Sequence, residues 1–530
     1  MRKLLKNIIV CLLTGFMATG CTSDFEEMNK SPFQPSEVEP ELVFPFICRE
    51  APNLRWDAYQ CGDNFHANLF AQYIANTSMN FSHDRYQYND EADFGYWEPY
   101  YLYILKNIAV VEESIDKFPY SSYTFQLMRI LRAMSTAKIT DLFGDIPYFN
   151  AGKGEEKLAY DKQKDIYYDI FKELKEAVDI LNSGLKGQKK LGKSDFIYNG
   201  DFSKWIKFAN SLRLRYALRL SFVDPEKAKS EGESALAAGV MENGEDGAMS
   251  VTNKIDWRTY GYPLITICHW SEFRMSNTME KIMTETGTID DPRLPVIWGQ
   301  TKLHSKGEGP KFKGIPNGLP ADQLESKEYS VDMFSNVYGL QFFPAWNSEN
   351  VEPQGGQWLS KKFPVMYYSE VCLLKAEAAI RNWKGSGNAK ENYEAGIRAS
   401  FEENRSGVDV KLLDLSNDDT YITTGQVAWN DNDNFETKLE KIITQKWICL
   451  FPNGNEAWAE FRRTGYPRLT PIVHSDNPNI DPSKGEFIKK IMYVDEERRN
   501  NKEHCESPDL NQGQGDGGHV RVWWDTKRYK

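Results

Sequence analysis

The stretch that decides the fold class is residues 369–405, in which "SEVCLLKAEAAIRNW" and "AKENYEAGIRASFEENR" flank the turn "KGSGN". Both flanks have helical periodicity, and Ala376 and Ala379 are small enough to admit a closely packed neighbour. The unit of about 35 residues matches the roughly 34-residue period of tetratricopeptide hairpins. Such a hairpin cannot bury its apolar face alone, so we expect it to stack on others.

Further helical patterns surround this hairpin. In each, apolar residues recur every three or four positions and so line one face of a helix. Asp224, Pro225 and Gly239 are typical of an N-cap, a first helical residue and a helix stop. The predicted helical segments are 101–118, 124–148, 165–184, 202–222, 224–239, 437–451 and 455–467. We therefore predict a mostly α fold in which tetratricopeptide-like hairpins form a scaffold. An unspecialised helical bundle is the alternative.

Residues 251–364 differ from the rest of the chain. They are dense in Gly, Pro and aromatic residues, with one convincing helix near "NTMEKIMTET". Loops on a rigid scaffold carry function more often than helices do. We expect a helical scaffold over about 41–250 and 365–530 that supports a loop-rich binding region over about 251–364, all within one domain of residues 41–530.

The N-terminus predicts export and lipid anchoring. A basic start, an apolar run over residues 8–17 and the small residues 18–20 precede Cys21. The run is too short to span a bilayer, which takes about 20 apolar residues, and is typical of a removable signal. Small residues directly before Cys21 resemble a bacterial lipobox, although Ala18 replaces the usual Leu. An ordinary signal with an incidental cysteine is the alternative. Residues 1–20 are thus predicted to be a lipoprotein signal peptide, and 21–40 a lipidated flexible tether.

Composition excludes several classes of function. The formal net charge of -12 argues against nucleic-acid binding, which demands clustered Lys and Arg. The cysteines after Cys21 form no CxxC pair, and the histidines have no ligand spacing, so we expect no metal and no cofactor. A disulfide such as Cys48 with Cys61 is an open alternative to buried free thiols, which we favour.

Enzymatic motifs are absent from the sequence. It contains no HExxH, Walker A, GxSxG or GxGxxG opening a helix. The Gly-rich "NQGQGDGGHV", 511–520, has no predicted helix after it to hold a phosphate, so we expect a loop. Asp90, Glu91 and Asp93 are more typical of solvated or ligand-facing carboxylates than of catalytic ones. We therefore predict a protein without catalytic residues.

Aromatic residues cluster in polar, Gly- and Pro-containing segments. A sugar ring stacks its C–H face on Trp or Tyr while its hydroxyls pair with amide, carboxylate or guanidinium groups, and peptides also favour aromatic platforms. By contrast, Trp205, Trp383, Trp447 and Trp458 lie on helical stripes and are assigned to packing. The candidate ligand residues form three clusters, Trp257, Tyr260, Tyr262 and Trp270, then Arg85, Tyr86, Tyr88 and Trp97, and finally Trp346 with Asn347.

The order of several segments resembles one family. A lipidated Cys21, an acidic tether, "ILRAMSTAKITDLFGDIPYFNA", "KWIKFANSLRLRYALRL", "DDPRLPVIW", the 369–405 hairpin, "QKWICLFPNGNEAWAEFRRTGYP" and "VWWDTK" together resemble the SusD/RagB nutrient-binding lipoproteins of Bacteroidetes. The acidic "SDFEE" after Cys21 is similar to the signal that sends their lipoproteins to the outer face of the outer membrane. The resemblance runs from Cys21 nearly to Lys530.

This resemblance implies tetratricopeptide-like hairpins under a loop-rich ligand face, and a hinged lid over a SusC-like TonB-dependent transporter. It implies capture of glycans or, in some members, peptides, without chemistry. Because family ligand residues vary, none is carried over to this chain. We expect an oligosaccharide-binding lipoprotein of the outer membrane that faces the cell exterior. The alternatives are a peptide ligand, a surface glycoside hydrolase and a structural tetratricopeptide adaptor.

Overall fold

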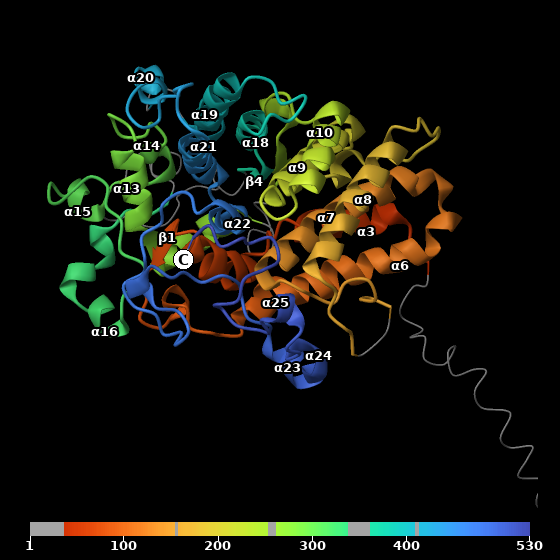
Figure 1. Ribbon diagram of the computed structural model, residues 1–530, viewed down its shortest axis with the longest axis horizontal. Coiled ribbons are helices and arrows are strands. Elements are labelled where there is room, and N and C mark those ends of the chain that lie inside the picture. The colour runs from red at the N-terminus through yellow and green to blue at the C-terminus, as the bar shows by residue number, and fades with distance from the viewer. Residues whose placement is uncertain (1–36, 154–156, 253–260, 338–360, 409–412, 530) are drawn as a thin grey trace, which may run out of the picture.

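The computed structural model describes residues 37–153, 157–252, 261–337, 361–408 and 413–529. These residues are mostly helical, with two small antiparallel sheets (Figure 1). In one sheet β1 (Ile74–Asn76) pairs with β3 (Phe273–Met275), Ala75 opposite Arg274; in the other, β2 (Ala248–Ser250) pairs with β4 (Phe363–Met366). The predicted mostly helical fold class is confirmed.

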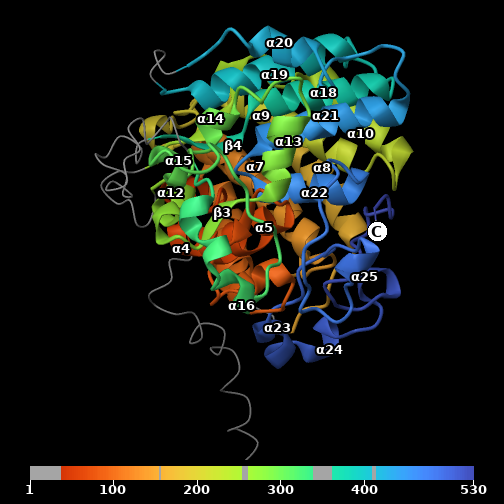
Figure 2. The ribbon, with the colours of Figure 1, turned by 90° about the vertical axis from the view of Figure 1, so that its left-hand side faces the viewer.

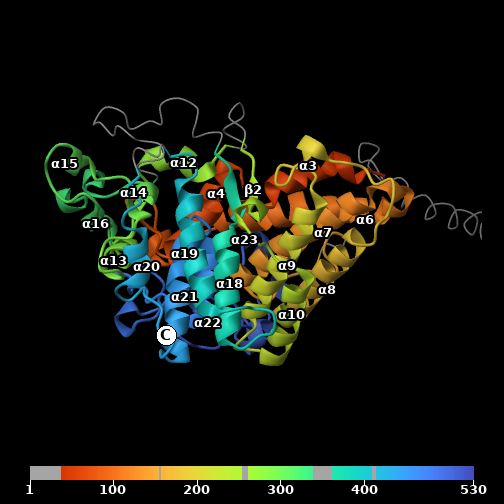
Figure 3. The same cartoon turned by 90° about the horizontal axis from the view of Figure 1, so that it is seen from above.

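Paired helices form the scaffold, and the tetratricopeptide-like character predicted from residues 369–405 is present. The partners of each pair pack against each other, and α18 also packs on α9 and α21. Figure 3 shows α18, α19 and α21 beside α9, α10 and α8. The pairs are α7 (Ser122–Phe143) with α8 (Gln163–Leu181), α9 (Phe202–Arg219) with α10 (Pro225–Ala238), α18 (Tyr368–Ile380) with α19 (Ala389–Arg405), and α21 (Phe435–Leu450) with α22 (Gly454–Thr464).

Local signals explain where these helices begin and end. The Asp224 side chain accepts a hydrogen bond from the backbone N–H of Lys227 at 3.2 Å, and Pro225 is the first residue of α10, as the sequence predicts. Gly465 ends α22 with a φ of 80°, a left-handed conformation that glycine adopts without steric cost.

The N-terminal helices before α7 contain π-helical turns, which are rare and frequently occur at functional sites. α3 (Pro40–Glu50) is followed by α4 (Trp56–Tyr59), which continues into the π-helix η1 (Gln60–Ala67) and α5 (Asn68–Phe70). The π-helices η3 (Asp93–Trp97) and η4 (Pro99–Leu105) precede α6 (Lys106–Ser114). η1 and η3 touch at glycine, since a Cβ on Gly95 would lie 2.2 Å from the backbone nitrogen of Gly62.

The remaining helices are short and lie mostly in the loop-rich parts of the chain. Figure 2 shows α4 and α12 on one side of the molecule and α25 on the other. These helices are α12 (Pro263–Ile267), the 3₁₀ turn η9 (Cys268–Trp270), α13 (Asn277–Glu285), α14 (Leu294–Ile297), α15 (Lys302–Ser305), α16 (Ala321–Leu324), α20 (Asp418–Thr423), α23 (Asp495–Asn500), α24 (Lys502–Cys505) and α25 (Leu510–Gly513).

One hydrophobic core joins the N-terminal and C-terminal halves, from Phe44 to Trp524. The tryptophans assigned to packing, Trp205, Trp383, Trp447 and Trp458, are all buried in it. Cys48, Cys268, Cys372, Cys449 and Cys505 are buried free thiols, as the favoured alternative to a disulfide predicts, and Cys61 is a free thiol that is only partly buried.

Within this core, four helices share a buried ion network of four cations and four carboxylates. The guanidinium of Arg215 binds both oxygens of Glu370 at 2.7 and 2.6 Å, and that of Arg463 binds both oxygens of Glu377 at 2.8 and 2.7 Å. The network comprises Arg215 and Arg219 of α9, Glu370 and Glu377 of α18, Lys446 of α21, and Glu456, Glu460 and Arg463 of α22. Its balanced charges offset the cost of burial only while each partner is present.

Two carboxylates of this network, those of Glu377 and Glu460, have lowered pKa values and stay ionised. Burial raises the pKa of Glu377, but the charges of Arg463 and Arg381 outweigh it, and the pKa lies below its ordinary value of 4.5. Burial also raises the pKa of Glu460, but the charges of Arg463, Lys446 and Arg219 outweigh it, and this pKa lies well below 4.5. Because these folded-state pKa values are depressed, the network stabilises the fold above pH 4.5, and this contribution is lost as the pH falls towards the folded-state values.

We predict that Glu377→Ala lowers the free energy of unfolding by about 3–5 kcal/mol, because Arg463 and Arg381 then lose their shared carboxylate in a water-poor interior. Urea unfolding at neutral pH measures the loss. The matched control is Asp179→Ala, which removes a carboxylate that is 62% exposed and paired with Lys175 one turn away. It should cost about 0.5 kcal/mol or less. Equal losses in the two variants would contradict a stabilising role for the network.

Candidate functional site

An exposed tryptophan pair lies where α4 meets η9. Trp270, the last residue of η9, is 37% exposed, and Trp56 begins α4 and is partly buried. Their ring centroids are 5.2 Å apart with an interplanar angle of 82°, an edge-to-face contact. The left-handed Ser271, with a φ of 61°, then turns the chain into β3. The core holds the ring of Trp56 in place, and solvent reaches the ring of Trp270.

Hydrogen-bonding groups accompany the tryptophan pair. Gln60, the first residue of η1, donates from Nε2 to Glu272 Oε2 at 2.6 Å. The backbone carbonyl of Glu272 accepts from the N–H of Thr77 at 2.9 Å, next to the β1–β3 ladder. Partial burial raises the pKa of Glu272, and the hydrogen bond from Gln60 opposes that shift. An amide of η1 and a carboxylate directly before β3 are therefore held together, four residues after Trp56 and two residues after Trp270.

A cation and a further aromatic ring continue this surface through Arg55, the neighbour of Trp56. The guanidinium of Arg55 lies 5.3 Å from the ring centroid of Phe94 and pairs with Asp57 at 3.1 Å. Phe94, in η3, is 37% exposed. We call Arg55, Trp56, Gln60, Phe94, Trp270 and Glu272 the aromatic face.

The aromatic face suits binding of a neutral, polyhydroxylated ligand. Rings offer stacking, while Gln60, Glu272 and Arg55 offer donors and acceptors to hydroxyl groups. Among the described residues no group of His, Cys, Asp and Glu is arranged to hold a metal ion. Nothing on the face pairs a nucleophile with a general base.

The first predicted cluster is only partly described. Trp270 lies on the aromatic face, whereas Tyr262 is 1% exposed and packs on Phe363 with centroids 5.2 Å apart. Tyr262 therefore belongs to the core. Trp257, Tyr260, Trp346 and Asn347 lie outside the described residues.

The second predicted cluster fastens the N-terminal part of the chain to the C-terminal segment. Arg85 is 9% exposed, and its Nε donates to Asp476 Oδ2 at 2.7 Å. The hydroxyl of Tyr88 donates to Asp495 Oδ1 at 2.8 Å. Both side chains are therefore engaged in contacts within the protein.

Tyr86 and Trp97 of the same cluster lie in the hydrophobic core. Tyr86 is 3% exposed and packs edge-on to Phe70, while Trp97 is 5% exposed and lies 5.1 Å from Phe143. The polar sequence around Trp97 suggested a ligand surface. Its place in the π-helix η3 turns the ring inward instead.

Sequence reasoning missed Arg55, Trp56, Gln60, Phe94 and Glu272. A signal existed for Trp56, because "NLRWDAY" sets a tryptophan between Arg55 and Asp57 directly after a turn-like "PN". No local pattern brings Gln60 to Glu272, since the contact depends on the tertiary packing of α12 against α4 and η1.

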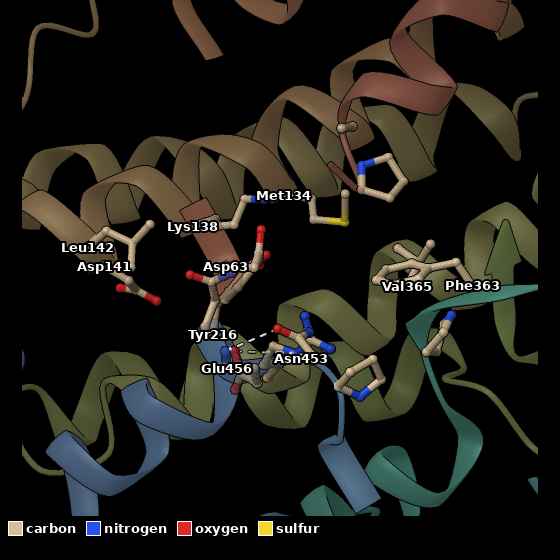
Figure 4. A pocket seen from close by; sticks show the side chains of 16 residues that line it. Asp63, Met134, Lys138, Asp141, Leu142, Tyr216, Phe363, Val365, Asn453 and Glu456 are labelled. Carbon is tan, nitrogen blue, oxygen red and sulfur yellow. Dashed lines mark hydrogen bonds and ion pairs between the residues drawn. The ribbon is translucent and has the colours of Figure 1, made fainter. Parts of the chain in front are cut away.

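Figure 4 shows a separate cavity between α7, α9, η1 and α22, towards which Asp63, Lys138 and Glu456 point. Its volume is 70 Å³, whereas ligand pockets usually measure about 300–1,000 Å³. Burial lowers the pKa of Lys138, and Asp63 opposes the shift. This space suits a few water molecules among buried polar groups.

A depression of 610 Å³ between α13 and α21 is large enough for a ligand. Four of its charged groups are paired with each other, Lys441 with Asp433 at 2.6 Å and Arg468 with Glu440 at 2.7 Å. Tyr393 in its lining is fully buried. It therefore offers fewer stacking surfaces than the aromatic face.

Comparison with known proteins now decides the family. The SusD-like family model, described as Susd and RagB outer membrane lipoprotein, matches residues 41–525. The chain belongs to the SusD-like family. No curated protein matches it.

Solved SusD-like structures cover almost the whole chain. A chitin-binding SusD homolog from Flavobacterium johnsoniae has a TM-score of 0.75 at 28% identity, over 92% of this chain and 99% of that one. A SusD homolog from Parabacteroides distasonis gives 0.79 at 26% identity, over 92% and 98%. One from Bacteroides thetaiotaomicron gives 0.70 at 27% identity, over 93% and 100%.

No helix in the part of this SusD-like chain that the structure describes is both long enough and apolar enough to cross a membrane.

We predict that Trp97→Ala lowers the free energy of unfolding of this SusD-like protein by about 3–5 kcal/mol, because the ring leaves a cavity against Phe143. Trp270→Ala removes an exposed ring and should cost about 1 kcal/mol or less. Chemical unfolding of the wild type and both variants measures the two losses in the free energy of unfolding. A larger loss in Trp270→Ala than in Trp97→Ala would contradict the assignment of these two rings to surface and core.

Proposed function

We propose that this SusD-like protein binds an oligosaccharide at the cell surface through its aromatic face. The observation that carries the proposal is the exposed Trp270–Trp56 pair beside the Gln60–Glu272 hydrogen bond. Rings that present a flat apolar surface next to fixed amide and carboxylate groups match the two kinds of surface on a sugar. One relative of 28% identity is described as chitin-binding, which makes chito-oligosaccharides the first ligands to test.

Binding in this proposal proceeds without catalysis. Glycoside hydrolysis uses two carboxyl groups across the scissile bond. On the aromatic face Glu272 accepts a hydrogen bond from Gln60, and the neighbouring Asp57 is paired with Arg55. Both carboxylates are thus engaged in fixing neighbouring side chains.

The predicted residues Trp257, Tyr260, Trp346 and Asn347 remain part of this proposal on sequence grounds. Trp257 and Tyr260 stand only ten to thirteen positions before Trp270, which favours a contribution to the same region. The proposed organisation remains a signal peptide over 1–20, a tether over 21–40 and one domain over 41–530.

We also propose that Cys21 carries the lipid anchor, that the protein faces the cell exterior, and that it delivers its ligand to a SusC-like TonB-dependent transporter. The supporting observations are the lipobox-like sequence at Cys21, the acidic "SDFEE" after it, and membership of a family of outer membrane lipoproteins.

We expect Trp270→Ala to weaken oligosaccharide binding by about 2 kcal/mol, or roughly 30-fold, because the stacking platform is lost. Calorimetric titration of the wild type with chito-oligosaccharides, other glycans and mixed peptides identifies the ligand, and the variant is then titrated with it. Trp429→Ala is the matched control, since Trp429 is partly buried against Tyr393, away from the aromatic face.

Unchanged glycan affinity in Trp270→Ala, or an equal loss in Trp429→Ala, would contradict the assignment of the site. Saturable binding of peptides with no response to glycans would show that the ligand is a peptide and not an oligosaccharide.

For the anchor and the partner, we expect Cys21→Ala to shift the protein from the membrane fraction to the soluble fraction, because no acyl chain can then be attached. We expect the wild type, solubilised in mild detergent, to copurify with a large β-barrel protein. Fractionation with immunoblotting and mass spectrometry of the purified complex measure both. A variant that stays in the membrane, or a wild type recovered alone in several mild detergents, would contradict the corresponding part of the proposal.

A further inference from the structure

The C-terminal segment forms a further hollow, on another side of the molecule from the aromatic face. It is an open depression of 640 Å³ lined by residues from 484 to 527. Figure 2 shows α25 at the opposite side of the molecule from α4 and α12. Part of the lining, Gln514 and His519, comes from the Gly-rich segment 511–520, for which the sequence assigned no role. We call this hollow the basic depression.

The charge of the basic depression is opposite to that of the whole protein. Its lining contains Lys484, Lys489, Arg521 and Lys527 but a single carboxylate, that of Glu486. The chain carries a formal net charge of -12. Like charges repel, so four cations gathered around one hollow favour an anion from outside the protein.

Lys489 is the most informative residue of this lining. It is 8% exposed, yet none of the described residues forms an ion pair or a side-chain hydrogen bond with its ammonium group. The neighbouring Lys490 is also buried, but its ammonium pairs with Asp516 and donates to the carbonyl of Ile491 at 2.9 Å. An ammonium group that is partly removed from water is more stable with a counter-charge beside it. The counter-charge of Lys490 is Asp516, within the protein. Lys489 has no such partner among the described residues and lines the basic depression.

The other cations of the lining are differently engaged. Arg521 pairs with Asp525 at 2.7 Å and donates to the carbonyl of Tyr529 at 2.8 Å, so its position is fixed. Lys484 pairs with Asp481 at 3.1 Å, and Lys527 lies exposed at the rim. Glu486 accepts from the backbone N–H of Asp481 at 2.8 Å, which holds it within the loop.

The pKa directions of Lys489 and His519 agree with an excess of positive charge around these two side chains. Burial, and then the charge of Arg521, lower the pKa of Lys489, against Glu486 and Asp525. Burial, and then Lys489 and Lys490, lower the pKa of His519, against Asp516 and Glu486. A bound anion would relieve the repulsion in both cases.

We propose that the basic depression binds an oxyanion, a phosphate or sulfate group carried either by a soluble sugar or by a lipid headgroup. Such a group accepts several charge-assisted hydrogen bonds at once. We expect the ammonium groups of Lys489 and Lys527 to donate them. This site is independent of the aromatic face and of the neutral oligosaccharide proposed to bind there.

The test titrates inorganic phosphate and inorganic sulfate into the unlipidated full chain, Cys21→Ala, at constant ionic strength. Saturable binding is expected, and Lys489→Gln should weaken it roughly 10-fold or more, because one charge-assisted contact is lost. Lys527→Gln at the exposed rim should also weaken it, and this variant leaves the buried side chains in place. Lys229→Gln, an equal charge change on α10 where Lys229 is 55% exposed, is the matched control and should leave affinity unchanged.

Absence of saturable binding, or equal affinities in the wild type, Lys489→Gln and Lys527→Gln, would overturn the proposal. Cosedimentation with phosphatidylcholine vesicles, with and without phosphatidylglycerol, then separates the sources of the group. Lys489-dependent binding to the anionic vesicles assigns the oxyanion to a lipid headgroup. Binding of phosphate or sulfate without vesicle binding assigns it to a soluble carrier.

Discussion

The fold depends on a buried network of salt bridges that ties together helices far apart in the sequence. α9 contributes Arg215 and Arg219, and the carboxylates of α18 and α22 neutralise them. Lys446 of α21 pairs with the same carboxylates of α22. The bidentate geometry of Arg215 with Glu370 and of Arg463 with Glu377 fixes these helices in both distance and rotation. Apolar stripes alone permit helices to slide, whereas paired buried charges tolerate one arrangement. The scaffold is therefore rigid where the two halves of the chain meet.

This scaffold supports two surfaces of different chemistry. On one side, α4 and η1 carry Trp56 and Gln60 to Trp270 and Glu272, and the face has rings, an amide and a carboxylate. On the other, the C-terminal loops gather lysines around a hollow, with Lys489 unpaired in the described part of the chain. The first surface fits the C–H faces and hydroxyls of a neutral sugar, and the second fits an oxyanion. Because the two surfaces lie on different sides of the molecule, they do not compete for one ligand.

The sequence predicted the scaffold well, because helical periodicity, N-caps and stop glycines are local signals. Asp224, Gly465 and the buried Trp447 lie as those signals indicate. The site was harder to predict, since exposure of an aromatic ring is a tertiary property. Trp97 stands in a polar segment but faces the core, because it lies in a π-helical turn. The contact of Trp56 with Trp270 depends on the packing of α12 against α4, which the sequence does not show. A π-helix breaks the period on which such reasoning depends.

The most direct test of the central claim, that the aromatic face holds the ligand, is amide hydrogen exchange of the whole protein with and without a saturating oligosaccharide. We expect slower exchange in residues 55–61 and 268–274, because a stacked sugar excludes water from α4, η1 and η9. Protection confined to other segments, such as α13 and α21 around the depression between them, would contradict it.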